Sequence, residues 1–149
     1  MKIRDFLKIK QQKTLTVSPE DSLKAATEKL VENNIGALPV CDEEGMLLGI
    51  ISERDLLRQT LNAVSPENTK VQDVMVRDVA VAGPEDELEY AARVMKTKRI
   101  RHLPVVTGNR LEAILSLRDI IEEQLKETEA EIRYAGLIRR SHLGRPQIP

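Results

Sequence analysis

Apolar side chains recur along the chain with two different spacings. In residues 14–17 they alternate with polar side chains, which predicts a strand, and in residues 18–34 they follow the spacing of one helix face. Ser18 is a typical N-cap and Pro19 suits the first helical position, so we expect the helix to begin there. The apolar residues at helical spacing are Leu23, Ala26, Leu30 and Val31.

Two short apolar runs follow this expected helix. Residues 37–41 and 47–51 flank the polar sequence Asp-Glu-Glu-Gly, an arrangement that predicts two strands joined by a tight turn. Ser52 then precedes residues 53–61, where it can cap a second helix. The first half of the chain therefore predicts the order strand, helix, strand, strand, helix.

The second half of the chain repeats this order. A shift of 65 positions superimposes identical residues in the first part of the repeat: Pro19 on Pro84, Asp21 on Asp86, Leu38 on Leu103 and Pro39 on Pro104. A shift of 64 does the same in the last part: Ser52 on Ser116, Arg54 on Arg118 and Asp55 on Asp119. A unit of roughly sixty residues buries too little surface to be stable alone. We therefore predict an α+β fold in which two repeats, related by a pseudo-twofold axis, pack through their sheets.

The repeat defines the expected organisation of the whole chain. Residues 1–13 form a charged lead-in, residues 14–62 the first repeat, and residues 63–121 the second. Residues 122–149 continue an amphipathic pattern that predicts one long helix, which ends before the Gly-Arg-Pro-Gln-Ile-Pro tail. The apolar positions of this helix are Ile121, Leu125, Ile132, Ala135 and Ile138.

Composition excludes several classes of protein. The 149 residues carry a net charge of -1, so no overall field favours nucleic acid or a membrane surface. Aromatic residues make up 2% of the chain, which leaves few platforms for stacking bases. The one cysteine, Cys41, lies in an expected strand and suits a core position. We expect a cytoplasmic protein without a metal site, and the sequence presents no set of residues typical of catalysis.

The repeated motifs resemble those of the CBS domain, named after cystathionine β-synthase. The resemblance covers about residues 10–121 and rests on Ser-Pro-Glu-Asp, on Ile-Gly-Ala-Leu-Pro-Val with Ile-Arg-His-Leu-Pro-Val, and on Gly-Ile-Ile-Ser-Glu-Arg-Asp. Two such domains in tandem form a Bateman module. The resemblance implies a regulatory module, which binds adenosine nucleotides or related ligands in the clefts between its halves. It also implies a homodimer that signals to a separate, unidentified protein.

The resemblance gives the Ser-x-x-Asp pairs a specific role. A serine at a helix start offers its hydroxyl and free N–H groups to a phosphate, and a carboxylate one turn later can accept hydrogen bonds from a ribose. An N-cap with an acidic residue near the helix dipole would give the same pattern without any ligand. The resemblance assigns a first cleft to Ser52, Arg54, Asp55, Arg99, Ile100, Arg101, His102 and Pro104. It assigns a second cleft to Ile35, Gly36, Ala37, Pro39, Ser116, Arg118 and Asp119.

The two expected clefts differ in charge. Arg101 and His102 favour the first cleft for a phosphorylated ligand, whereas the second replaces the family's glycine, present here as Gly49, by Ala113. We therefore expect tighter nucleotide binding in the first cleft and weaker binding in the second. AMP or ATP is the expected ligand, ADP, NAD and S-adenosylmethionine remain open, and no cofactor is required. The alternative is a structural dimerisation module without a physiological ligand.

Overall fold

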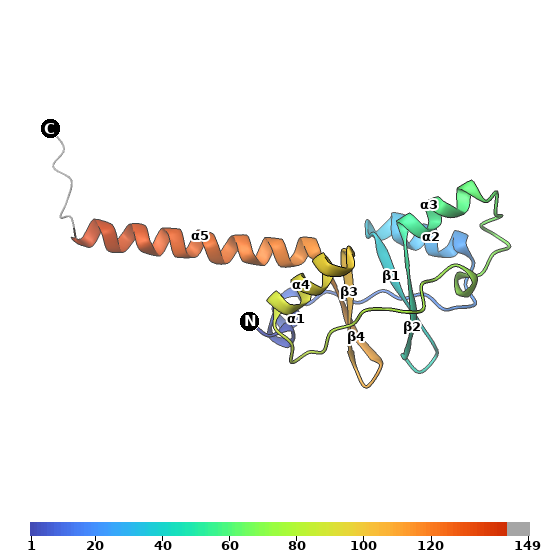
Figure 1. The fold of residues 1–149 in the computed structure, drawn as a ribbon, viewed down its shortest axis with the longest axis horizontal. Coiled ribbons are helices and arrows are strands. Elements are labelled where there is room, and N and C mark those ends of the chain that lie inside the picture. The colour runs from blue at the N-terminus through green and yellow to red at the C-terminus, as the bar shows by residue number, and fades with distance from the viewer. Residues whose placement is uncertain (143–149) are drawn as a thin grey trace.

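The computed structural model describes the backbone of residues 1–142 and the side chains of residues 1–137. Two hairpins lie side by side in the middle of the molecule, and helices cover their outer sides (Figure 1). Each hairpin is a separate two-stranded antiparallel sheet. A long C-terminal helix extends away from this body. These features confirm the predicted α+β fold with two repeats.

The first repeat contains α2 (Leu23–Asn33), β1 (Ala37–Cys41), β2 (Leu47–Ser52) and α3 (Glu53–Leu61). Its hairpin has the predicted turn. The Asp42 side chain accepts hydrogen bonds from the backbone N–H groups of Glu44 and Met46, both at 2.9 Å. Gly45 completes the turn with a φ of +83°, a conformation that glycine adopts without strain.

The predicted start of the first long helix is wrong by one turn. The helix begins at Leu23, and the cap is Ser22, whose side chain accepts a hydrogen bond from the N–H of Ala25 at 3.0 Å. Ser18 instead begins a turn in which the Asp21 carboxylate accepts the N–H of Ser18 at 2.9 Å. Because Asp21 satisfies this donor locally, the Ser-Pro-Glu-Asp motif forms a turn before the helix rather than its first turn.

The predicted first strand of each repeat is reduced to a single parallel bridge. Val17 pairs with Val40, and its N–H donates to the Pro39 carbonyl at 3.0 Å. Ala82 pairs with Val105 in the same way in the second repeat. A proline in the middle of each inner strand accepts this hydrogen bond but cannot donate one, which limits how far the pairing extends.

The second repeat contains α4 (Leu88–Lys98), β3 (His102–Thr107), β4 (Arg110–Ser116) and the start of α5 (Leu117–His142). A short 3-10 helix, η1 (Val71–Asp73), lies in the linker, residues 62–81, which leads from α3 to the bridge at Ala82. The predicted long helix is confirmed, and it begins at Leu117, directly after β4. The prediction that it ends before residue 144 lies outside the described residues.

Each repeat has its own buried cluster, and the N-terminal segment belongs to one of them. The first 13 residues were predicted only as a charged lead-in, yet they form α1 (Ile3–Lys10). The side chains of Ile3 and Phe6 are 0% and 1% exposed, within the core of the second repeat. Arg4, Asp5 and Lys8 of α1 are exposed, so a strongly charged sequence still supplies core residues from its other face.

The tips of the two hairpins join the repeats directly. The N–H of Leu47 donates to the Asn109 carbonyl at 2.9 Å, and the N–H of Leu111 donates to the Gly45 carbonyl at 3.1 Å. These backbone bonds hold β2 and β4 beside each other at one end. Cys41 is buried near this end, and its burial, with Asp42 nearby, raises the pKa of its thiol. It has the core position that the sequence predicts.

Candidate functional site

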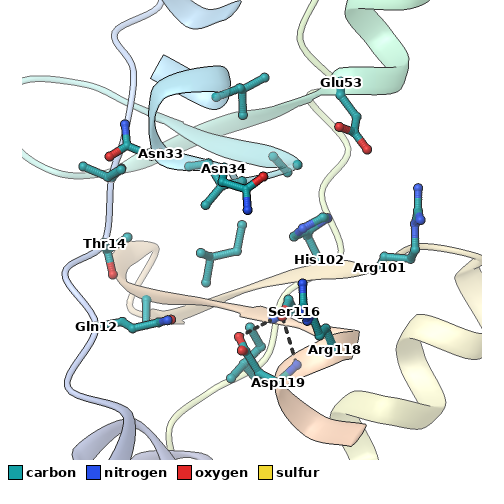
Figure 2. Close-up of a pocket in the computed structure, with 18 of the residues that line it drawn as sticks. Gln12, Thr14, Asn33, Asn34, Glu53, Arg101, His102, Ser116, Arg118 and Asp119 are labelled. Atoms are coloured by element: carbon teal, nitrogen blue, oxygen red, sulfur yellow. Dashed lines mark hydrogen bonds between the residues drawn. The ribbon is translucent and has the colours of Figure 1, made fainter. Parts of the chain in front are cut away.

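A cleft of about 1910 Å³ lies between the two repeats. Figure 2 shows Asn33, Asn34 and Thr14 on one side of this cleft and Ser116 and Asp119 on the other. The first repeat and the segment before it contribute Gln12, Lys13, Thr14, Asn33, Asn34, Ile35, Gly36, Ala37 and Glu53. The second repeat contributes Arg101, His102, Ala113, Ile114, Ser116, Arg118 and Asp119. The cleft therefore combines segments that lie up to about a hundred positions apart in the sequence.

Ser116 and Asp119 form a reciprocal cap at the start of α5. The Ser116 side chain accepts the N–H of Asp119 at 3.0 Å, and the Asp119 carboxylate accepts the N–H of Ser116 at 3.4 Å. Ser52 and Asp55 make the same pair of contacts at the start of α3, which is a capping box. Helix capping alone is therefore enough to account for the Ser-x-x-Asp pair in each repeat. At Ser116 and Asp119, it also directs a carboxylate and a helix N-terminus toward a large cleft.

Lys10, at the end of α1, forms an ion pair with the Asp119 carboxylate. Its ammonium group lies 2.7 Å from Oδ1 of Asp119 and 3.7 Å from Oε2 of Glu122. Burial alone would raise the pKa of Asp119, but hydrogen bonds from Lys10 and Ser116 and the charge of Lys10 lower this pKa below its ordinary value. The same hydrogen bond to Asp119 raises the pKa of Lys10.

In another part of the cleft wall, Gly36, just before β1, packs against His102 at the start of β3. A Cβ atom on Gly36 would lie 3.2 Å from Cε1 of His102, so the glycine allows the two repeats to approach closely here. Burial lowers the pKa of His102, and the charge of Arg101 adds to this effect, while Glu53 and Asp119 oppose it. The His102 imidazole lines the cleft, and its lowered pKa favours the neutral form.

The edge of β4 faces the cleft. In the first repeat, the equivalent edge of β2 is covered, because Ile50 donates to and accepts from the backbone of Val76 at 3.0 and 2.9 Å. Ile114, the counterpart of Ile50, has no such backbone pair within residues 1–142. Its position in the β3–β4 register turns its N–H and C=O away from β3. A backbone donor and acceptor are therefore available beside Asp119.

The residues that the sequence assigns to a first cleft do not all meet in one cavity. A smaller hollow of about 630 Å³ is lined by Arg54, Arg99, Ile100 and Arg101, but Ser52 and Asp55 do not line it. Arg101 and His102 also line the large cleft, because Arg101 directly precedes β3, His102 begins it, and the partner strand β4 ends at Ser116. Pro39 and Pro104 are buried within their strands. The large cleft thus gathers the remaining residues of the expected second cleft together with Arg101 and His102 of the first.

Lys10, Gln12 and Thr14 are polar residues of the large cleft that the sequence does not assign to it. They precede the first repeat or begin it, where the sequence offers only a run of charged and polar residues. Asn34, which the resemblance places beside Gly36 and Ala37 in the second cleft, lines the large cleft. It ends α2 in the left-handed conformation, with a φ of 50°, which asparagine tolerates better than most residues.

Comparison with known proteins identifies the family. The family model of the CBS domain matches residues 4–62 and again residues 71–126. The chain belongs to the CBS-domain family. The second CBS match extends past the start of α5, and the first includes most of α1.

Curated relatives match this chain over very different shares of their own length. The chain is 39% identical over 111 residues to inosine-5'-monophosphate dehydrogenase of Methanocaldococcus jannaschii, covering 74% of the chain and 21% of that enzyme. It is 33% identical over 115 residues to the CBS domain-containing protein YhcV of Bacillus subtilis, covering 77% of the chain and 81% of YhcV. Two further relatives are matched over 40% and 36% of their length. The chain therefore spans well under half of several curated relatives.

Two solved CBS structures contain adenosine compounds. CBSX2 in complex with AMP matches with a TM-score of 0.71 and 28% identity, covering 85% of this chain and 98% of that one. The CBS domain pair of MJ0100, in complex with 5'-methylthioadenosine and S-adenosyl-L-methionine, matches with a TM-score of 0.76 and 25% identity, covering 85% and 98%. The fold of this chain is therefore that of a CBS pair.

The described part of the chain contains neither a membrane-spanning helix nor a cluster of metal-ligating side chains. No helix there combines the length and the apolar content that crossing a bilayer requires. The same residues contain no group of three or more His, Cys, Asp or Glu side chains placed to hold a metal ion.

Proposed function

We propose that this CBS pair binds an adenosine-containing ligand in the large cleft between its repeats and regulates a separate protein. One observation carries the proposal: the Ser116–Asp119 cap and the open backbone edge at Ile114 lie in the same cleft. The complexes of CBSX2 and of the MJ0100 pair with adenosine compounds support this choice of ligand class.

The residues of the cleft match the parts of such a ligand. The Asp119 carboxylate can accept hydrogen bonds from the two ribose hydroxyls, since an ionised carboxylate has several acceptor positions. The N–H and C=O of Ile114 complement the adenine edge, which presents a ring nitrogen as acceptor and an amino group as donor. The N-terminus of α5, with Arg118 and Arg101 nearby, favours a phosphate.

We infer that phosphorylated ligands bind the large cleft more tightly than the smaller hollow. Cations line both sites, Arg101 and Arg118 in the large cleft and Arg54, Arg99 and Arg101 in the hollow, so the preference rests on the Ser116–Asp119 cap and the open edge at Ile114, which the large cleft combines. In the first repeat, Val76 covers the strand edge, and Ser52 and Asp55 do not line the hollow beside Arg54. Arg54, Arg99 and Ile100 then form a second, weaker binding site.

A thermal-shift and calorimetry series tests the ligand. Adenosine, AMP, ADP, ATP, NAD and S-adenosylmethionine are each titrated into the purified protein. A ligand that binds only the folded state raises the apparent stability, by about 2.7 kcal/mol at a hundred times its Kd. We expect AMP or ATP to give the largest rise. If none of the six raises the melting temperature or gives binding heat, the proposal fails.

Regulation requires that the ligand changes the shape or dynamics of the module, because a ligand shifts an equilibrium only by its differential affinity for two states. The cleft joins segments of both repeats, so we expect AMP to protect residues 34–37 and 114–119 from hydrogen exchange. Protection that spreads to α5 would support signalling to a partner. Unchanged exchange and unchanged X-ray scattering at saturating AMP would indicate a static binder.

A second candidate function, structural dimerisation, rests on α5. Ile121, Leu125 and Ile132 are 46%, 57% and 67% exposed along this helix, and a second copy of the chain would cover them. We propose a homodimer, which is compatible with either function. Analytical ultracentrifugation at micromolar concentration tests it, and a monomer would contradict it. A dimer that binds none of the six ligands would favour the structural function.

A further inference from the structure

Lys10 forms an ion pair with Asp119, the carboxylate to which the ribose of the proposed ligand would bind. Its ammonium group is 2.7 Å from Oδ1 of Asp119, while Oδ2 of the same carboxylate accepts the backbone N–H of Ser116. The side chains of Lys10 and Asp119 are 23% and 18% exposed, so this ion pair is partly buried at the wall of the cleft. A ribose that hydrogen-bonds to Oδ1 of Asp119 therefore competes with Lys10 for this atom.

The backbone of Lys10 is fixed, but its side chain is free to turn. Ile3 and Phe6 anchor α1 in the core of the second repeat. Lys10 is the last residue of that helix, and its ammonium group lies 5.9 Å from the centroid of the Phe6 ring. A lysine has four rotatable bonds, so its ammonium group can leave Asp119 while α1 stays in place.

The cost of breaking the Lys10–Asp119 ion pair depends on whether the ligand provides a new anionic partner for Lys10. A ribose can replace the hydrogen bond that Asp119 loses, but an unphosphorylated nucleoside leaves the ammonium group of Lys10 without its closest partner. Glu122, whose Oε2 lies 3.7 Å from the ammonium group, is then its remaining anionic partner, and losing the closer, hydrogen-bonded one in a partly buried position is costly. A phosphate provides a new anionic partner, so it removes this penalty.

We propose that Lys10 is a specificity-determining residue that makes the cleft prefer 5'-phosphorylated nucleosides to unphosphorylated ones. In the free protein it pairs with Asp119, and in the complex it pairs with the ligand's phosphate while the ribose takes Asp119. This inference rests on the proposed binding of adenosine compounds, and it adds the contribution of the N-terminal helix to that binding.

Calorimetry with AMP and adenosine tests the proposal in wild type and in Lys10→Met. Methionine keeps much of the apolar stem and removes the charge. We expect the affinity for AMP to fall about tenfold or more, since a charge-assisted hydrogen bond is lost. The affinity for adenosine should stay the same or increase, because its competitor for Asp119 is gone. The ratio of the two affinities should therefore fall at least about tenfold.

Lys8→Met is the matched control. Lys8 lies on the same helix and lines the same cleft, but among the described residues the cation paired with Asp119 is Lys10. This variant removes an equal charge, and we expect the affinity ratio to change less than about threefold. An equal loss in both variants would indicate a general field rather than a specific contact, and would overturn the proposal.

Two further variants separate the loss of the Lys10 charge from a loss of helix stability. Lys10→Gln gives the same comparison if Lys10→Met destabilises α1, which circular dichroism detects. Lys10→Arg keeps the charge and should keep the preference for AMP. An unchanged AMP-to-adenosine ratio in Lys10→Gln overturns the role of Lys10 while leaving the proposed function intact. If wild type binds neither compound, the proposed function itself fails.

Discussion

The two repeats share a sequence motif but differ at the strand edge next to it. In the first repeat, the linker that leads to the second repeat pairs with β2, where Val76 exchanges two backbone hydrogen bonds with Ile50. In the second repeat, the chain leaves through α5, and the edge of β4 at Ile114 remains open to the large cleft. The comparison shows that duplication sets the two capped helices, whereas chain connectivity decides which strand edge a ligand can reach.

The cores of the repeats differ in the same way. The second repeat recruits α1 from the far end of the chain, through Ile3 and Phe6. The core of the first repeat instead includes Val71 and Met75 from the linker that follows α3. Each repeat thus depends on a segment outside its own motif, and each dependence can be tested by substitution.

Phe6→Ala should give the largest effect on stability. Removing a fully buried phenylalanine costs about 3–5 kcal/mol, from lost burial and the cavity left behind. We expect the free energy of unfolding, measured by chemical denaturation, to fall by this amount. Ile9→Ala on the same helix is the control, since Ile9 is 62% exposed and should change stability by less than about 0.5 kcal/mol. Similar values for both variants would mean that α1 is not part of the core.

Asp119→Ala should separate the two clefts by affinity. We expect it to weaken AMP binding about 10- to 100-fold, because hydrogen bonds to a charged group contribute about 1.5–3 kcal/mol. Asp55→Ala removes the equivalent carboxylate of the first repeat, and we expect a change below about threefold. Calorimetry on both variants, with Asp119→Asn as a conservative check on folding, decides the matter. A larger loss at Asp55 would reverse our assignment of the stronger site.

Gly49→Ala should loosen the covered edge of the first repeat. An added Cβ would lie 2.7 Å from the carbonyl oxygen of Val76 and 2.9 Å from the sulfur of Met75, so the linker must move away from β2. Overpacking of this kind costs about 1–3 kcal/mol of unfolding free energy. The second repeat already has Ala113 at this position, and Ala113→Gly should cost only about 0.5–1 kcal/mol. Equal denaturation midpoints for Gly49→Ala and wild type would contradict this account of the linker.

His102 should give the smallest effect, a dependence of stability on pH. Burial, reinforced by Arg101, lowers the pKa of this imidazole below its ordinary value of 6.5. The unfolded chain therefore binds the proton more readily, and the stabilising contribution of neutral His102 is lost as the pH falls from about 6.5 through the lowered pKa. His102→Asn should flatten the curve of melting temperature against pH in this window.

Asp119 provides the control for this measurement, because it acts in a more acidic range. Its lowered pKa contributes stability above the ordinary value of 3.8, and this contribution is lost below that value. The two windows can be told apart in one titration. An unchanged slope between pH 5 and 6.5 in His102→Asn would show that another group titrates there.

Features that depend on short stretches of chain could be predicted from the sequence. The hairpin turns, the cap at Ser52 and the long helix after β4 follow from local chemistry: turn residues, a hydroxyl before a helix, and apolar periodicity. The start of α2 was predicted one turn early because Ser18 and Ser22 are both plausible caps. The choice between them depends on Asp21, which closes a turn onto Ser18.

The sequence by itself determined that two similar units exist and that each carries a Ser-x-x-Asp cap. Only the tertiary structure decided that Lys10 pairs with Asp119 and that Arg101 and His102 line the large cleft. It also decided that Val76 covers the outer edge of β2, whereas within residues 1–142 no equivalent contact covers the edge of β4 at Ile114. These contacts join segments that are distant along the chain. Their geometry depends on how the repeats pack and on where the linker runs, and periodicity and local propensity encode neither.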